Sequence, residues 1–506
     1  METVKIAARL IAAVLLFSGC GLILIEDWET RGPNTGNALS APTVPTLSPP
    51  ETLPGPAFDP RPSRRGEAEE ALEKLYLIDL SGPGLIIAVN TDGDDILFSS
   101  EDDPFSNFYS ARNNMVTDRY NLRLTVMSMA TDDMRSSLKA SVKSGADGDY
   151  YSDVIELPAA VAGEFAISGL LMNLRKLPYY NLPSEGMAAC GSYGTYCFFD
   201  LSETTRSWSL RPVLYMNTSM AARDTVSEVT KAARNGSFDF DCMLKAVKDS
   251  ELPDGAYGIS AEYGDIGCSV MGELAAVRSG LSLTSVAGGY PAVTYVTGDT
   301  AAQLSDLIAL LMKNVYVPSV SEPTDTGVAA QSSSASPFDC FCESRSLFHV
   351  GRLRDIAGSL KDRKVRWTAL PLPKVSASQD SVYTLASPGK SVLCAPANNK
   401  RTEQTGIFLS ASAAASGNWI GDDYANFCLN EGYFRDNDSY FTLLSFIDEP
   451  EYFDFSYIFG SQVANLDAAT YAALRKCASE GTPLSESSVP LITKLNAALK
   501  KLKFPG

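Results

Sequence analysis

Short apolar segments alternate with helical ones from residue 66 onward, and this alternation constrains the fold more than any other feature. The run "LIIAV" is apolar throughout, as strands buried on both faces of a parallel sheet are. Alternation of this kind builds a parallel, doubly wound α/β sheet. We predict strands at 85–89, 122–129 and 153–158. Helices are predicted at 66–78, 105–121, 134–145 and 160–174, so that the two kinds of element alternate along the chain.

Ligands of doubly wound sheets bind at the carboxyl ends of the parallel strands. In this chain "NTDGDD" follows the first predicted strand, and "ELP" ends the third. Carboxylates at such an edge can accept hydrogen bonds from ligand hydroxyl groups. For the aspartates a solvated acidic turn or a helix cap is the alternative, and for the glutamate an ion pair across the sheet. The candidate ligand-binding carboxylates are Asp92, Asp94, Asp95 and Glu156.

The N-terminus has the layout of an export signal. Lys5 and Arg9 precede a short apolar run, and the small pair Ser18-Gly19 leads into Cys20. This layout resembles a bacterial lipobox, so we expect residues 1–20 to be a lipoprotein signal peptide and Cys20 to be lipidated at the extracellular face of the cell membrane. Two alternatives stay open. One is an uncleaved anchor, for which a largely apolar run of 16 residues is slightly short of the roughly 17–25 required, and the other is an ordinary cleaved signal.

A proline-rich segment follows the signal. Nine prolines lie between Pro33 and Pro62, among Thr, Ser, Gly and Ala and without helical or strand periodicity. Such a segment is solvated and extended, and 30 residues of it span on the order of 50–90 Å. We therefore predict a disordered tether at 21–65 and the start of the folded part near Gly66.

Length and charge narrow the class of protein. About 440 residues follow the tether, too many for one ordinary core, so two domains or lobes are expected. The net charge is −18, and no Lys/Arg-rich run is present. A nucleic-acid partner requires a basic face, so none is expected.

The cysteines and the single histidine argue against a metal site. Nine cysteines remain besides Cys20, none in a CxxC pair, and His349 alone cannot complete a Cys₂His₂ zinc site. We expect neither metal nor cofactor. The glycine-rich loop "CGSYGTYC" makes Cys190 and Cys197 the best disulfide candidates. Nine is odd, so at least one thiol stays free if the others pair within the chain.

Six segments, taken in their order along the chain, carry a resemblance to a known family. They are "MVTDRYNLRLTV", "SGADGDYYSDVIELPAAVAGEFAISGLLMNLRKLP", "RPVLYMNTSM", "RNGSFDFDCMLKAVKD", "VRWTALPLPK" and "GYFRDNDSYFTLLSFI". Together they resemble extracellular solute-binding proteins of bacterial ABC importers, of the sugar-binding family 1 type and close to lipoproteins of Firmicutes. The Ser-rich stretch "DTGVAAQSSSASPFDCFC", the "GDIG" region and the cysteine content depart from that family and leave the ligand open.

The resemblance implies a periplasmic-binding-protein-like type II fold, with two interleaved doubly wound α/β lobes joined by a hinge. It places lobe 1 at 66–205 and 367–418, and lobe 2 at 206–366 and 419–506. It also implies a monomer that captures a small solute, with an oligosaccharide as one candidate, between the lobes and delivers it to ABC permease subunits without covalent chemistry.

Sugar sites of such proteins pair carboxylates with aromatic rings, because a sugar presents hydroxyl groups and an apolar face. Four aromatic residues lie near predicted crossovers or loops, and each is alternatively a core residue. Trp419 is the strongest candidate, because "SGNWIGDDY" is polar around it. The four candidates are Trp208, Tyr215, Tyr263 and Trp419.

An enzyme needs a nucleophile or an acid–base set, and neither HExxH nor GxSxG occurs. "SPGKSV" lacks the first glycine of a phosphate loop. A catalytic triad around His349 is formally possible, but a packed or surface histidine fits its apolar neighbours better. Two rivals to the transport hypothesis remain. One is a surface-anchored binding or scaffold lipoprotein, and the other is a secreted hydrolase.

Overall fold

The computed structural model describes most of residues 60–502, and all statements below concern that part of the chain. Outside it lie 1–59, 83, 92–95, 100–101, 145–150, 182–191, 194–195, 207, 254, 262–283, 288–289, 294–304, 306–314, 317–335, 378, 380–383, 386–389, 453–455, 460–475, 478–481, 484–485, 487–492, 494–495 and 503–506. The predictions that fall there, and so stay predictions, are the signal peptide with Cys20, most of the tether, Asp92, Asp94, Asp95, Cys190 and Tyr263.

The first lobe contains a four-stranded sheet of order β14-β3-β1-β2. Its strands are β1 (Leu85–Asn90), β2 (Leu124–Met129), β3 (Val154–Pro158) and β14 (Ser391–Cys394). β1 pairs with β2 and β3 in parallel, as the apolar run "LIIAV" predicts, whereas β14 is antiparallel to β3. Beyond β14, Asp200 adds an antiparallel bridge to Leu393.

The second lobe contains a five-stranded sheet of order β10-β7-β11-β6-β12. β6 is antiparallel to both of its neighbours, while β7 is parallel to β10 and β11. Each sheet thus holds one antiparallel strand that the chain inserts on crossing from the other lobe, β6 here and β14 in the first sheet. The strands are β6 (Pro212–Asn217), β7 (Tyr257–Ala261), β10 (Val315–Tyr316), β11 (Ser346–Arg352) and β12 (Trp367–Leu370).

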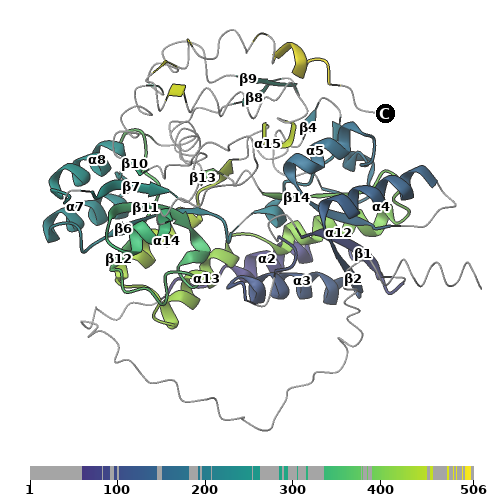
Figure 1. Ribbon diagram of the computed structural model, residues 1–506. Helices are drawn as coiled ribbons and strands as arrows, with labels where there is room; N and C mark the ends of the chain where they lie inside the picture. The colour runs from purple at the N-terminus through teal and green to yellow at the C-terminus, as the bar shows by residue number, and fades with distance from the viewer. Residues whose placement is uncertain are drawn as a thin grey trace, which may run out of the picture.

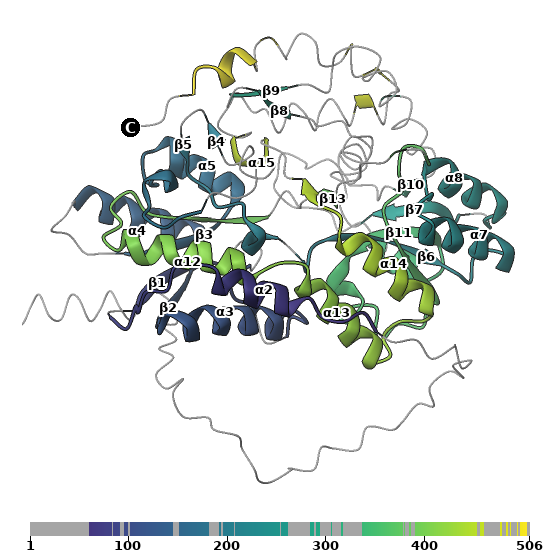
Figure 2. The same cartoon turned by 180° about the vertical axis from the view of Figure 1, so that it is seen from behind.

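Helices cover both sheets, and the views from front and back place the two lobes side by side (Figures 1 and 2). α5 ends earlier than predicted, at Ile167, where Gly169 takes a left-handed φ of 72°. The helices are α2 (Arg65–Glu73), α3 (Ser106–Tyr120), α4 (Thr131–Ser144), α5 (Ala159–Ile167), α7 (Arg223–Arg234), α8 (Phe240–Asp249), α11 (Pro337–Cys342), α12 (Thr402–Ala415), α13 (Trp419–Asn430), α14 (Asn437–Ile447) and α15 (Ser456–Phe459).

Several short elements complete the described chain. The 3-10 helices are η2 (Leu174–Lys176), η3 (Glu203–Thr205) and η4 (Leu353–Asp355), and the two-stranded pairs are β4 (Ser192–Tyr193) with β5 (Tyr196–Cys197), β8 (Thr284–Ala287) with β9 (Tyr290–Val293), and β13 (Thr384–Leu385) with β15 (Glu451–Tyr452).

Two predicted boundaries are wrong. β12 pairs with β6, so the chain is still in the second lobe at 367–370 and returns to the first only before β14. At the other end, α15 lies in the range predicted for the second lobe but does not belong to it. α15 packs on α5 of the first lobe, where Phe459 lies 5.7 Å, centroid to centroid, from Phe199.

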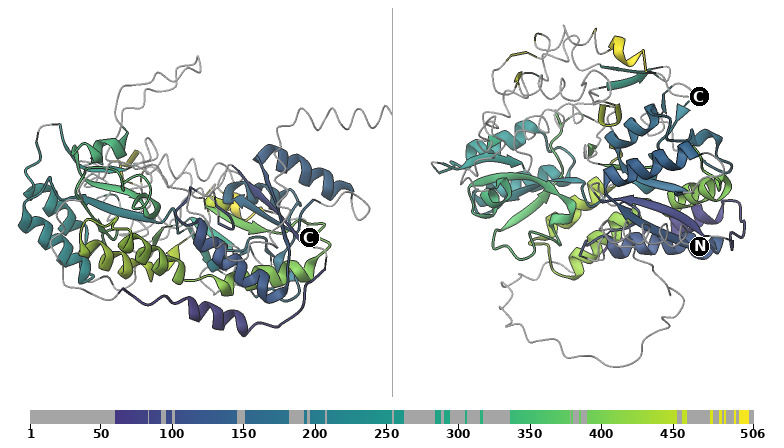
Figure 3. Two further views of the ribbon diagram at one scale, coloured as in Figure 1. Left: turned by 90° about the horizontal axis from the view of Figure 1, so that it is seen from below. Right: turned by 45° about the vertical axis from the view of Figure 1, so that its right-hand side comes forward.

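The predicted tether is also too long. Residues 60–64, which we call the N-terminal strap, are part of the folded protein and lead directly into α2. In the view from below, the purple segment that contains the strap and α2 runs from one lobe to the other along the lower edge of the picture (Figure 3, left). Proline content alone could not reveal this, because the partners of the strap lie more than 350 residues away in the chain.

Buried apolar clusters connect the two lobes. One of them joins Phe105 and Tyr109, from the first lobe, to Tyr215, Trp367 and Tyr424. Phe105 stacks on Tyr424 with a centroid distance of 4.1 Å. Among the described helices, none has both the length and the apolar composition needed to cross a bilayer.

Candidate functional site

The candidate site lies where the carboxyl ends of the parallel strands meet the connections between the lobes. In the first sheet this edge holds Asn90 and Glu156, and β14 enters it opposite Pro158. In the second sheet the end of β11 at Arg352 lies opposite the start of β6 at Pro212. Both inserted strands therefore enter at the edge where ligands of such sheets bind.

Glu156 holds the chain that follows β1 rather than pointing freely toward a ligand. It is buried, and its two carboxylate oxygens accept hydrogen bonds from the backbone N–H groups of Ile96 (2.9 Å) and Leu97 (3.1 Å). We therefore replace its predicted role as a direct contact with a positioning role. The two residues that it fixes directly follow Asp92, Asp94 and Asp95 in the sequence, in the connection from β1 to α3.

Arg112 holds the same two residues through their carbonyl oxygens. Its guanidinium is buried and donates to the carbonyl oxygens of Ile96 (2.8 Å) and Leu97 (3.1 Å), and Asn113 donates to the latter at 2.7 Å. Burial lowers the pKa of Arg112 to about 10, and the nearby Glu156 carboxylate opposes that shift, so the group is a cation at neutral pH. Sequence reasoning missed this arginine. Its place on the apolar stripe of helix 105–121 was the available signal.

The three described aromatic candidates are core residues, which corrects the prediction that their rings stack on a solute. Trp208, Tyr215 and Trp419 are each at most 1% exposed. The Tyr215 hydroxyl donates to the Arg352 carbonyl oxygen at 2.7 Å, and Trp419 Nε1 donates to the Ala415 carbonyl oxygen at 3.0 Å. Complete burial leaves no ring face for a ligand, so we no longer propose these residues as contacts.

Trp208 instead belongs to the connection between the lobes. The guanidinium carbons of Arg206 and Arg211 lie 5.1 and 5.3 Å from its ring centroid. Arg211 also donates to the carbonyl oxygen of Glu449, on the later connection after α14, at 2.6 Å. The tryptophan therefore stabilises the hinge, through cation–π contacts on a buried ring.

A buried polar group at the start of β14 was also missed. Lys390 lies 2.7 Å from Glu451, and both side chains are almost fully buried. Asp200 accepts from the hydroxyls of Tyr180 (2.8 Å) and Ser202 (2.7 Å), and burial raises its pKa to about 6, against an opposing effect of Lys390. Lys390 belongs to "SPGKSV", and a lysine directly before a buried strand was the signal available in the sequence.

His349 is packed inside the second lobe, as expected from its apolar neighbours. Its Nδ1 lies 3.0 Å from Ser260 Oγ, and burial lowers its pKa to about 3. Within the described residues no carboxylate hydrogen-bonds to this ring, and Nε2 has no polar partner. An imidazole that is inaccessible and only weakly basic is unsuited to act as the base of a catalytic triad.

Cysteines and metal ligands add no further site. Cys197 is buried on β5, and its predicted partner Cys190 lies outside the described residues, so that disulfide stays a prediction. Cys340 and Cys342 are free thiols. In the described part of the chain, no cluster of His, Cys, Asp and Glu could hold a metal ion.

Comparisons with known proteins identify the fold. No family model matches the chain, and no curated protein sequence does. The cyclic alpha-maltosyl-1,6-maltose binding protein of Arthrobacter globiformis is 12% identical, covers 83% of this chain and 100% of its own, and has a TM-score of 0.54. The sugar-binding protein MalE of Xanthomonas citri is 10% identical, with coverages of 83% and 98% and a TM-score of 0.51. The predicted periplasmic-binding-protein-like fold is confirmed.

Proposed function

We propose that this chain is an extracellular solute-binding protein that captures a small solute between its lobes for an ABC importer. The observation that carries this proposal is the exchange of strands between the sheets, β6 into one and β14 into the other. The exchange brings the ligand-binding edges of both sheets to the hinge, so that rotation of the lobes can enclose a solute.

An oligosaccharide is the solute class that we propose first. The two proteins compared above bind sugars according to their names, and they share this fold over almost their whole length. The acidic loop after β1 would accept hydrogen bonds from sugar hydroxyl groups. Tyr263, two residues beyond the end of β7, would provide an aromatic face. The proposed contacts are Asp92, Asp94, Asp95 and Tyr263.

The proposal includes the anchor and the partners. A signal peptide at 1–20, a lipidated Cys20 and a tether that ends at residue 59 would hold a monomer at the outer face of the membrane, near its permease. It involves no covalent chemistry. The packing of His349, which removes the one histidine from solvent, supports a binding protein over a hydrolase.

A thermal-shift screen of the full-length protein tests the proposal. The probes are maltose, maltotetraose, cyclic glucose oligosaccharides, free amino acids and short peptides. A solute at 100 times its dissociation constant stabilises the protein by about 2.7 kcal/mol, which raises Tm by a few degrees. The variant Asp92→Asn/Asp94→Asn/Asp95→Asn should lose the shift, while Asp102→Asn, outside the loop, should keep it. No shift with any probe would favour the scaffold lipoprotein.

A further inference from the structure

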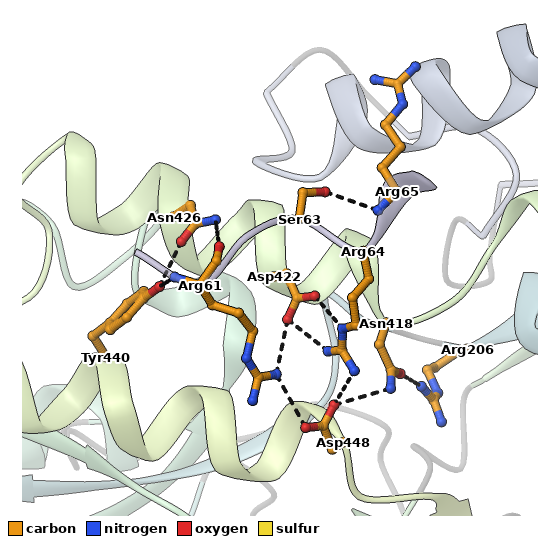
Figure 4. Close-up of polar contacts among 10 residues, drawn as sticks. All are labelled: Arg61, Ser63, Arg64, Arg65, Arg206, Asn418, Asp422, Asn426, Tyr440 and Asp448. Atoms are coloured by element: carbon orange, nitrogen blue, oxygen red, sulfur yellow. Dashed lines mark hydrogen bonds and ion pairs between the residues drawn. The ribbon is translucent and has the colours of Figure 1, made fainter. Parts of the chain in front are cut away.

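The N-terminal strap makes a dense set of polar contacts with the second lobe (Figure 4). Arg64 donates to both carboxylate oxygens of Asp422, at 2.6 and 2.8 Å, and to Asp448 at 2.6 Å. Arg61 reaches the same two aspartates, each at 3.2 Å. The backbone of Arg61 is also held, since its N–H donates to Tyr440 and its carbonyl oxygen accepts from Asn426.

Asp422 depends on the strap for its countercharge. Its side chain is fully buried in the first turn of α13, and among the described residues its ion pairs are with Arg61 and Arg64. The hydrogen bond to Asp422 is the main cause that raises the pKa of Arg64, so its guanidinium stays charged. A buried carboxylate that loses its partner is strongly destabilising, so these bonds do more than surface ion pairs do.

The same aspartates lie at the connections between the lobes. Asp448 directly follows α14, where the chain leaves the second lobe toward α15. Asn418, between α12 and α13, donates to Asp448 at 3.2 Å and also bonds to Arg206 of the first connection. One polar cluster therefore joins the strap to three connections (Figure 4).

Beyond the strap, the chain is fixed to the first lobe. α2 packs on α12, and Leu72 is buried in the core of that lobe. Arg119 of α3 donates to the carbonyl oxygens of Glu73 (2.9 Å) and Leu75 (3.0 Å). The strap and α2 thus bridge the helices of the second lobe to those of the first, beneath the hinge (Figure 3).

We infer that the strap clamps the hinge, and that Arg61 and Arg64 are positioning residues that set the balance between lobe arrangements. Rotation of the lobes changes the distance between α13 and α12, which the strap and α2 join, so it must strain or break these ion pairs. A clamp that favours one arrangement changes the fraction of molecules whose lobes are arranged to bind solute. The apparent affinity for the solute changes in proportion to that fraction. This consequence for affinity rests on the proposed function, whereas the clamp itself does not.

The test measures the distance between the lobes of the full-length protein without solute. Spin labels carried by unnatural amino acids replace the exposed Lys139 on α4 and Lys248 on α8, and pulsed electron spin resonance gives the distance distribution. In Arg61→Gln/Arg64→Gln we expect a broader distribution or a second population. Once a solute is known, its dissociation constant should change by about fivefold or more.

A matched control removes two cations from exposed pairs elsewhere. Lys74 pairs with Glu70 at 2.8 Å and Lys245 with Glu228 at 2.6 Å, so Lys74→Gln/Lys245→Gln should leave the distribution unchanged. If the strap variant does not fold, Asp448→Asn replaces it, because that carboxylate is 44% exposed. The inference is overturned if the folded strap variant shows the same distance distribution as the wild type. Where Asp448→Asn replaces the strap variant, the same result in Asp448→Asn overturns it. If the strap variant shows altered distances but the protein binds no solute, the clamp is supported and only the proposed function is rejected.

Discussion

Single buried charges hold the backbone of Ile96 and Leu97, which directly follow the acidic segment 92–95 in the sequence. The carboxylate of Glu156 accepts from two backbone N–H groups, and Arg112 holds the carbonyl oxygens of the same two residues. Sequence reasoning placed Glu156 correctly at the end of its strand. It assigned the wrong role, because the partners of a carboxylate depend on a loop whose path the sequence does not specify.

Replacing Glu156 with Gln should lower the free energy of unfolding by about 2 kcal/mol, since one amide oxygen cannot replace two charged acceptors. It should also weaken solute binding, because the backbone directly after the proposed contacts Asp92, Asp94 and Asp95 loses two hydrogen bonds. Urea denaturation measures the first effect. The control Glu164→Gln, from a partly exposed pair with Arg135, should cost less than about 1 kcal/mol. Equal losses in the two variants would contradict the positioning role.

Asp200, which bridges to Leu393 of β14, predicts a pH dependence of stability. Burial raises its pKa to about 6, above the usual value of 3.8. At a pH between these two values, Asp200 is therefore protonated in the folded protein and ionised in the unfolded chain. This contribution to stability is present at low pH and is lost as the pH rises through 6. Relative to Asp200→Asn, the wild type should lose roughly 2 kcal/mol between pH 4 and pH 7.5. Parallel stability profiles of the two proteins would show that Asp200 titrates normally.

At the scale of elements, local patterns predicted most strands but not their partners. The first and third predicted strands match β1 and β3 closely, and "RPVLYMNTSM" contains β6. β12 was assigned to the wrong lobe, because its partner β6 lies 150 residues earlier and an apolar run does not identify the sheet that it joins. The strap was missed for the same reason.

The packing of α13 on the first connection should tolerate no added methyl group at Gly421. A Cβ there would lie 2.6 Å from Trp208 and 3.0 Å from Ile447. Gly421→Ala should therefore destabilise the protein by about 1–3 kcal/mol, as measured by urea denaturation. At Gly66 in α2 a Cβ meets nothing within 4 Å, so Gly66→Ala should be neutral or slightly stabilising. A neutral Gly421→Ala would mean that this interface is loosely packed.

For the whole molecule, the sequence predicted the architecture better than the site. Two interleaved lobes follow from β/α alternation and from the order of the segments that resemble solute-binding proteins. The predicted aromatic contacts failed because Trp208, Tyr215 and Trp419 pack at the hinge and in the cores, where a polar sequence neighbourhood says little about burial.

The most direct test of solute capture is the inter-lobe distance between labels at positions 139 and 248, measured in the full-length protein with and without the solute identified by thermal shift. A solute enclosed between the lobes should shift the distribution to a shorter, narrower distance. The loop variant Asp92→Asn/Asp94→Asn/Asp95→Asn should stay at the unliganded distance. A bound solute that leaves the wild-type distribution unchanged would contradict capture between the lobes.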